Sequence, residues 1–132
     1  MRYEYVTQST IKQHWDFIKF GLNKILRKSP ECWIPEDVYA KAIYQQAHIW
    51  LVQSENGNSD GFFILEPNGD TCHVWCAWAV ESDLLVDGVE QIEKIAREMG
   101  ARRVTFDTNR AGWSRVATKL GFIPRTWVKE LK

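Results

Sequence analysis

Two side chains that could accept a proton lie on neighbouring predicted strands. Glu66 ends the apolar run "GFFILE" (61–66), and His73 lies near the start of "TCHVWCAWAV" (71–80). Either group could deprotonate an amine, directly or through a water molecule. A single His or Glu on a strand is more often a structural group, so the sequence makes both residues candidates for catalysis without assigning the role.

Cys72, His73 and Cys76 also have a spacing that suggests metal binding. On an extended strand, Cys72 and Cys76 would share a face and lie about 13 Å apart, at roughly 3.3 Å per residue. A zinc ion needs thiolates about 2.3 Å from one centre. We therefore predict no metal site, and small apolar-like cysteines in a core strand. With Cys32 the cysteine count is three, which predicts free thiols and a reducing compartment.

The seven tryptophans are many for 132 residues. Trp75 and Trp78 are three positions apart, so a regular strand would point them to opposite faces. One would then be a core residue, and the other could contact a ligand or a partner. Trp113 is expected to anchor a helix on the sheet. Trp127 completes a possible aromatic platform.

The charge distribution limits the kinds of partner. The chain has 17 basic and 17 acidic residues, which argues against general nucleic-acid binding. Residues 54–96 hold 1 basic and 9 acidic residues, whereas 97–132 hold 9 basic and 3 acidic ones. We expect two oppositely charged surfaces. No signal peptide or membrane-length apolar run is present, which predicts a cytoplasmic protein.

The hydrophobic pattern predicts ten secondary-structure elements in a single domain (1–132). Strands are expected where apolar residues alternate with polar ones or form short runs between turn residues. These stretches are 2–6, 47–53, 61–66, 71–80, 102–108 and 122–131. Helices are expected where apolar residues recur every three or four positions. They run from Ile11 to the Ser29-Pro30 pair, from near Pro35, and over 83–99 and 111–120.

The order of these elements indicates an α/β fold, β-α-α-β-β-β-α-β-α-β. Short turn-rich connections (54–60 and 67–70) join three consecutive strands, which predicts an antiparallel meander. A strand–helix–strand crossover follows the meander. Together they predict a mixed sheet with helices on both faces.

That order, closing in "ATKLGFIPRTWVKEL" (117–131), resembles the GNAT superfamily of acyl-CoA-dependent N-acyltransferases. The resemblance covers nearly the whole chain and rests more on the order and lengths of the elements than on the motif Leu-Gly-Phe. Within the superfamily, "RAGW" (110–113) followed by a helix and Gly-Phe is similar to a group of small proteins encoded by tailed bacteriophages.

The segment that would bind the donor departs from the family pattern. In the family's enzymes a Gly-rich loop after Arg or Gln binds the CoA pyrophosphate through backbone N–H groups. The matching segment, "AVESDLLVDGVEQ" (79–91), has one glycine, and acidic residues (Glu81, Asp83 and Asp87) lie where the phosphates would be. Like charges at close range lower affinity. If a donor does bind, the resemblance implies contacts with Trp78, Val80, Leu85, Val86, Gly88 and Arg110.

A second departure concerns the acid that protonates the departing thiolate. Many family members use a tyrosine on the last helix, and the matching position here is Ala117. All four tyrosines precede residue 45, so the resemblance leaves Ser114 as the stand-in. Arg110 lies where the family often has Asn, and it could bind an anion or pair with Asp107.

The two departures favour a GNAT-fold protein without standard acyl transfer. Such a protein would need no cofactor and would bind a protein partner or a second copy, as an assembly component of a phage virion. The alternative is an acyl-CoA-dependent N-acetyltransferase with an atypical pyrophosphate loop. Acetyl-CoA would then be its donor, and Glu66, His73 and Ser114 would be its catalytic candidates. Fold alone does not decide between the two.

Overall fold

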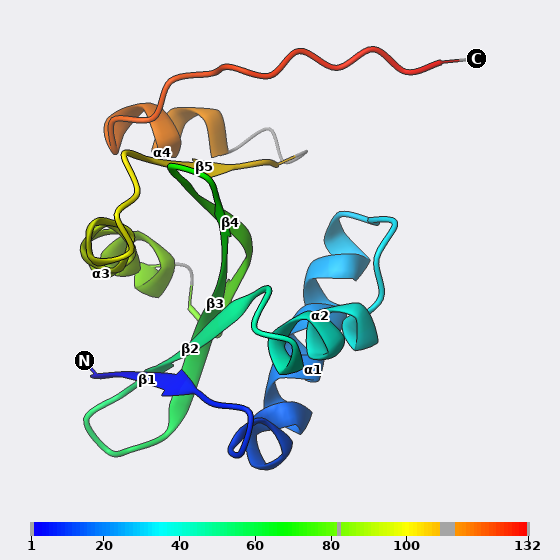
Figure 1. Ribbon diagram of the computed structural model, residues 1–132, viewed down its shortest axis with the longest axis vertical. Coiled ribbons are helices and arrows are strands. Elements are labelled where there is room, and N and C mark those ends of the chain that lie inside the picture. Colours follow the sequence, from blue (N-terminus) through cyan, green and yellow to red (C-terminus); the bar gives the residue numbers. More distant parts are fainter. Residues whose placement is uncertain (1, 82, 109–112, 132) are drawn as a thin grey trace.

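The computed structural model describes residues 2–81, 83–108 and 113–131, without the side chains of Asp83, Leu85, Val86, Trp113 and Ser114. It contains the following elements: β1 (Arg2–Val6), α1 (Ile11–Lys28), α2 (Pro35–Ile43), β2 (His48–Gln53), β3 (Ser59–Asn68), β4 (Thr71–Ala79), α3 (Asp83–Glu98), β5 (Arg103–Phe106) and α4 (Trp113–Lys119). The strands form one sheet in the order β1-β2-β3-β4-β5 (Figure 1). The first three pairings are antiparallel and β4–β5 is parallel, so the predicted mixed sheet is confirmed.

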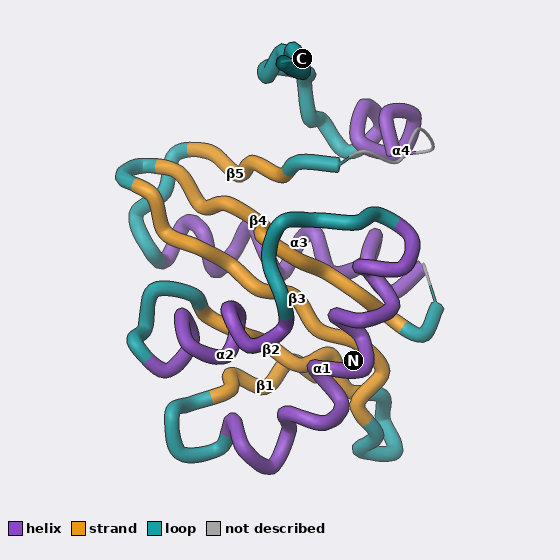
Figure 2. Tube along the Cα trace, turned by 90° about the vertical axis from the view of Figure 1, so that its right-hand side faces the viewer, coloured by secondary structure: helices purple, strands orange, loops and turns teal. Residues whose placement is uncertain are grey.

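The helices cover both faces of the sheet, as the sequence predicted. Figure 2 shows α1 and α2 in front of the strands and α3 behind them. A helix needs about 20 predominantly apolar residues to cross a membrane. No helix among the described residues is long and apolar enough to do so.

Two buried clusters hold these layers together. On the α1 and α2 face, the fully buried side chains include Ile18, Leu22, Val38 and Phe62. On the α3 face, Ile92, Ile95 and Ala96 pack on strand residues that include Leu65 and Cys72. The helical residues recur at the spacing predicted from the sequence, because burial of one apolar stripe is the main gain when a helix docks on a sheet.

Gly21 allows α1 to approach the sheet closely. A Cβ atom at this position would lie 2.4 Å from Cε2 of Phe62 and 2.7 Å from Cε3 of Trp78. No real Cβ atom tolerates such distances, so the helix could not sit at this depth with any other residue.

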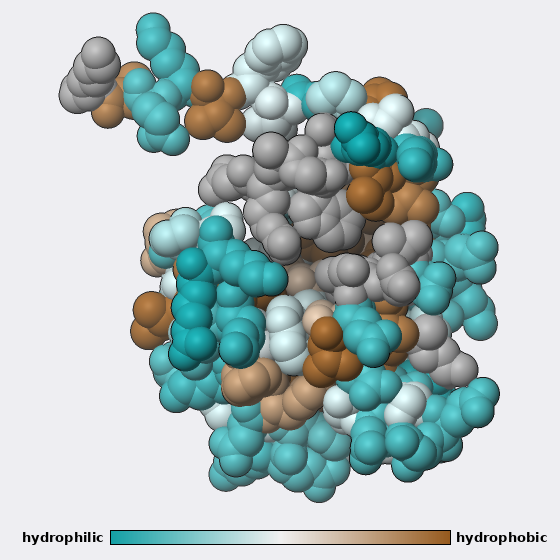
Figure 3. All heavy atoms as spheres, turned by 180° about the vertical axis from the view of Figure 1, so that it is seen from behind, coloured by the Kyte–Doolittle hydropathy of each residue, from teal (hydrophilic) through white to brown (hydrophobic). Residues whose placement is uncertain are grey.

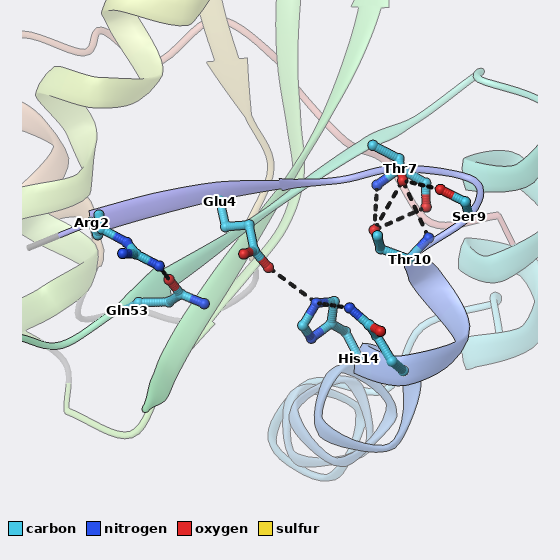
Figure 4. Close-up of polar contacts among 8 residues, drawn as sticks. Arg2, Glu4, Thr7, Ser9, Thr10, His14 and Gln53 are labelled. Carbon is cyan, nitrogen blue, oxygen red and sulfur yellow. Dashed lines mark hydrogen bonds and ion pairs between the residues drawn. The ribbon is translucent and has the colours of Figure 1, made fainter. Parts of the chain in front are cut away.

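Polar contacts fix the first strand and the start of α1 (Figure 4). Arg2 donates to Oε1 of the buried Gln53 at 2.9 Å, and His14 Nε2 lies 3.0 Å from Glu4 Oε2. The backbone N–H of Thr7 donates to Thr10 Oγ1 at 2.8 Å, which closes the turn before α1.

A β-bulge in β4 corrects two predictions. In the β3–β4 pairing, Leu65 lies opposite Val74 but Ile64 lies opposite Cys76, so Trp75 is an extra residue in β4. The bulge shifts the alternation of side chains by one position. Trp75 and Trp78 therefore both pack on the α1 and α2 face, and the prediction that they point to opposite faces is wrong.

The same shift separates the two strand cysteines. Cys72 belongs to the core under α3, whereas Cys76 belongs to the core under α1 and α2. The prediction that they share a face is wrong for the same reason. Their burial in the core is confirmed.

The sixth strand, predicted over 122–131, is not part of the sheet. This segment leaves α4 as an extended tail that pairs with no strand in the described residues. Its composition suits a strand, but the backbone of a strand needs a partner. The tail projects from the body of the molecule (Figures 1 and 3).

Candidate functional site

The site begins where β4 and β5 separate. The two strands pair only from Thr71 with Arg103 to Val74 with Phe106, and β4 then continues to Ala79. Beyond Val74, no strand in the described residues covers this edge of β4. The bulge at Trp75 follows directly after the last pair. An uncovered edge offers backbone N–H and C=O groups to an extended ligand, and bulges are common beside active sites.

Glu66 and His73 are direct neighbours across β3 and β4. Residues opposite each other in an antiparallel pair lie on one face, with Cβ atoms about 4.5 to 5.5 Å apart. Their side chains are 21% and 24% exposed, so both are sheltered but accessible. The structure thus brings together the two candidates that the sequence placed on separate strands.

Lys41 of α2 shows which face these side chains occupy. Its Nζ atom lies 2.9 Å from Glu66 Oε2 and 4.7 Å from the centre of the Trp75 ring. The Trp75 ring in turn packs edge-on against Trp33. Glu66 and His73 therefore lie on the α1 and α2 face, beside the bulge. The ammonium group of Lys41 contacts Glu66 there.

β5 extends this arrangement with two polar side chains. His73 Nδ1 lies 2.8 Å from Thr105 Oγ1, and His73 Nε2 lies 3.8 Å from Asp107 Oδ2. We call Lys41, Glu66, His73, Thr105 and Asp107 the polar row. A partner on Nδ1 orients an imidazole ring and leaves Nε2 for proton exchange. The polar row can hold a charged group and move a proton.

The Cys76 thiol, which lies on the same face of the sheet as the polar row, is not suited to nucleophilic attack. Burial, with the charges of Glu66 and Glu31 in addition, raises the pKa of the Cys76 thiol far above its ordinary value. A buried neutral thiol is a poor nucleophile. Chemistry at this site would therefore not pass through an intermediate bound to Cys76.

Three of the six residues predicted to bind a donor are described in full. Trp78 packs against Phe17, Phe20 and Phe62 on the α1 face. Val80 is 56% exposed just after β4, and its N–H donates to Asp60 O at 2.8 Å. Gly88 lies inside α3. Their role in binding a donor stays a prediction.

The other predicted site residues cannot be placed as side chains. Arg110 lies outside the described residues, so its predicted anion contact or pairing with Asp107 stays a prediction. Leu85, Val86 and Ser114 lie in α3 and α4, but their side chains are outside the described part.

The surface at the start of α3 is acidic. Glu81 and Asp87 are exposed on it. Burial raises the pKa of Tyr3 in β1, and the negative charges of Asp87 and Glu90 in α3 raise it further. A diphosphate placed here would meet repulsion.

Sequence reasoning missed three members of the polar row: Lys41, Thr105 and Asp107. Their proximity to Glu66 and His73 depends on the pairing of strands and the docking of α2, which no local pattern encodes. The turn "PNGD" (67–70) was a usable signal, because a tight hairpin fixes the register of its strands and so pairs Glu66 with His73. In the parts of the chain that are described, no group of three or more His, Cys, Asp or Glu could hold a metal ion.

Comparison with known proteins gives structural neighbours only. No protein-family model and no curated protein matches the chain. A probable acetyltransferase superposes with a TM-score of 0.76 at 17% identity, over 100% of this chain and 96% of the other. Aminoglycoside N-acetyltransferase AAC(6')-Iy, bound to a CoA-linked bisubstrate analogue, gives 0.72 at 12% identity, over 99% and 96%. An acetyltransferase of Trypanosoma brucei gives 0.61 at 14%, over 99% and 98%.

Proposed function

Because the chain has the GNAT acetyltransferase fold, we propose that it transfers an acyl group from a thioester donor to an amine. The observation that carries the proposal is the pairing of Glu66 with His73 on one face, beside the bulge where β4 loses its neighbour. Fold similarity at this low identity supports the reaction class without naming an acceptor.

In this proposal the donor lies along the uncovered edge of β4, with its carbonyl carbon near Trp75. The acceptor amine approaches from the α1 and α2 face. His73, oriented by Thr105, accepts the proton of the amine, and the Lys41–Glu66 pair holds the acceptor. The nitrogen forms a bond to the carbonyl carbon, the carbon–sulfur bond breaks, and the thiolate leaves and takes a proton from water.

Binding and turnover test the proposal separately. Acetyl-CoA and CoA are titrated by calorimetry while the melting temperature is followed, since a ligand of the folded state raises it. Release of CoA in the presence of a set of primary amines is then measured by mass spectrometry. We expect saturable binding, and a fall in kcat of about 100-fold or more for His73→Asn. The matched control is His14→Asn, because His14 pairs with Glu4 away from the polar row.

A second candidate function is a non-catalytic binding or assembly component. The acidic surface at the start of α3 favours it, because this surface opposes the nucleotide end of an acyl-CoA. Absence of heat on titration, with an unchanged melting temperature, would overturn the transferase proposal and favour this candidate. A place for such a component in a phage virion stays a prediction from the sequence.

A further inference from the structure

A pocket with a volume of about 340 Å³ lies between α1 and α2, which pack side by side on one face of the sheet (Figures 1 and 2). Five residues line it: Lys12, Trp15 and Asp16 of α1, and Glu36 and Tyr39 of α2. None of them belongs to the polar row. The volume lies near the lower end of the range for ligand sites, about 300–1,000 Å³. The pocket therefore suits a small molecule.

One wall of the pocket is aromatic. The rings of Trp15 and Tyr39 meet edge to face, with centroids 5.0 Å apart, and both side chains pack on the buried cluster under α1 and α2. Each side chain is only partly buried and lines the pocket with its remaining surface. Aromatic rings held in this way offer a large apolar contact area. This wall can hold the apolar part of a ligand.

The rim of the pocket carries charges of both signs. Lys12 and Asp16 are exposed and one helical turn apart on α1, so their Cβ atoms are neighbours at about 5–6 Å. Neither of them is in an ion pair within the described part of the chain. Glu36 lines the pocket from α2 and pairs with Lys19 at 3.3 Å. Lys12 and Asp16 can therefore bind a ligand without giving up an existing ion pair.

This arrangement distinguishes between classes of small molecule. A simple cation would meet the ammonium group of Lys12, and a simple anion would meet the carboxylates of Asp16 and Glu36. Like charges at close range oppose binding. An uncharged apolar molecule would take water from the charged groups without replacing it. A small zwitterion with an apolar part can pair with both signs of charge and still contact the rings.

We propose that this pocket binds a free α-amino acid with an apolar side chain. The ammonium group of the amino acid pairs with Asp16, its carboxylate pairs with Lys12, and its side chain lies against the rings of Trp15 and Tyr39. An α-amino acid carries both charged groups on one carbon atom, which matches the short separation of Lys12 and Asp16 on α1. The inference concerns binding alone and does not depend on acyl transfer.

The experiment titrates the ¹⁵N-labelled full chain with L-phenylalanine and follows the backbone amide resonances by NMR, which detects weak binding. Two further probes each lack one charged group: phenethylamine has no carboxylate, and 3-phenylpropionate has no ammonium group. We expect saturable shifts in α1 and α2 around the pocket with L-phenylalanine. Both other probes should bind at least about 10-fold more weakly, because each loses a charge-assisted contact.

Variants of the rim test the assigned pairs. Asp16→Asn and Lys12→Met should each weaken the binding of L-phenylalanine at least about 10-fold. Both side chains are exposed, so the fold should tolerate these changes. Lys28→Met is the matched control, because Lys28 is an exposed lysine at the other end of α1 that does not line the pocket. It should leave the binding unchanged.

Each other outcome overturns the proposal. If no resonance of α1 or α2 shifts up to the solubility limit of L-phenylalanine, the pocket is not an amino-acid site. Equal binding of the three probes would mean that the rings alone recognise an aromatic molecule. Shifts centred on the polar row would assign the amino acid to that site instead. Unchanged binding by both Asp16→Asn and Lys12→Met would show that the rim does not pair with the ligand.

Discussion

The side chains of the polar row can exchange a proton, whereas the buried Cys76 thiol cannot act as a nucleophile. His73 has an orienting partner on one ring nitrogen, and Glu66 has a cation at 2.9 Å, while the Cys76 thiol stays neutral in the core. Groups with these partners are suited to general acid–base chemistry. The same contacts make separate, measurable contributions to stability.

The Lys41–Glu66 ion pair should be worth more than an ordinary surface pair. Glu66 is 21% exposed and the pair has an aromatic ring beside it, so solvent screens it less. We expect a coupling of about 0.5–1 kcal/mol from urea unfolding of Lys41→Met, Glu66→Gln and the double variant. The Lys19–Glu36 pair, with side chains 46% and 56% exposed, is the control and should give a coupling near zero. Equal couplings would show that the environment of Glu66 does not matter.

Buried thiols should make the protein less stable in alkaline solution. Burial raises the pKa of Cys72 and Cys76 above the ordinary 9.0. Below that value the thiols are neutral in both states, and stability is complete. Above it they ionise only in the unfolded chain, so the free energy of unfolding falls by up to about 1.4 kcal/mol per pH unit for each thiol.

Urea unfolding at a series of pH values from about 8 to about 10 measures this slope. Cys76→Ala should reduce the slope whatever it does to stability at neutral pH, because one of the two thiols is gone. Cys32→Ala is the control, since Cys32 is exposed. A slope that is the same in all three proteins would contradict the assignment to buried thiols.

At the scale of elements, the sequence predicted nine of the ten segments close to where they lie. The periodicity of Ile11, Ile18 and Leu22 predicted α1, because apolar burial on one helix face is a local property of the sequence. The bulge at Trp75 was not predictable, since it arises from the pairing of β4 with β3. One extra residue then placed Trp78 on the same face as Trp75, and Cys76 on the face opposite Cys72.

The prediction of a strand over residues 122–131 failed for a different reason. Residues 122–131 have strand composition, but strand formation needs a neighbouring edge, and composition does not say which edge is available.

The candidate site was predicted only in part for a related reason. Glu66 and His73 could be selected by residue type, whereas Lys41 and Thr105 join them through docking and pairing.

Docking of α1 on the sheet should depend on Gly21. Gly21→Ala places a Cβ atom within 3 Å of ring atoms of Phe62 and Trp78, and such overpacking costs about 1–3 kcal/mol. Gly88→Ala is the matched control, because a Cβ there meets nothing within 4 Å and the glycine lies inside α3. It should raise stability by roughly 0.5–1 kcal/mol. Thermal and urea unfolding check both, and destabilisation by both substitutions would mean that α3 packs more tightly at Gly88 than the structure shows.

At the scale of the whole molecule, the two cores and the tail are independent. Both buried clusters, with the partly buried residues packed against them, lie within residues 3–104, and the backbone from 123 to 131 forms no backbone–backbone hydrogen bond in the described part of the chain. A chain ending at Phe122 keeps both clusters, the polar row and the cap at Gly121. We therefore expect it to fold, and to keep any binding of acetyl-CoA that the full chain has.

Differential scanning calorimetry of the full chain and of the chain ending at Phe122 checks this expectation. Both should unfold in one cooperative transition at similar melting temperatures, because no residue of 123–131 belongs to either buried cluster. A clearly lower melting temperature of the shortened chain would show that the tail contributes to the folded structure.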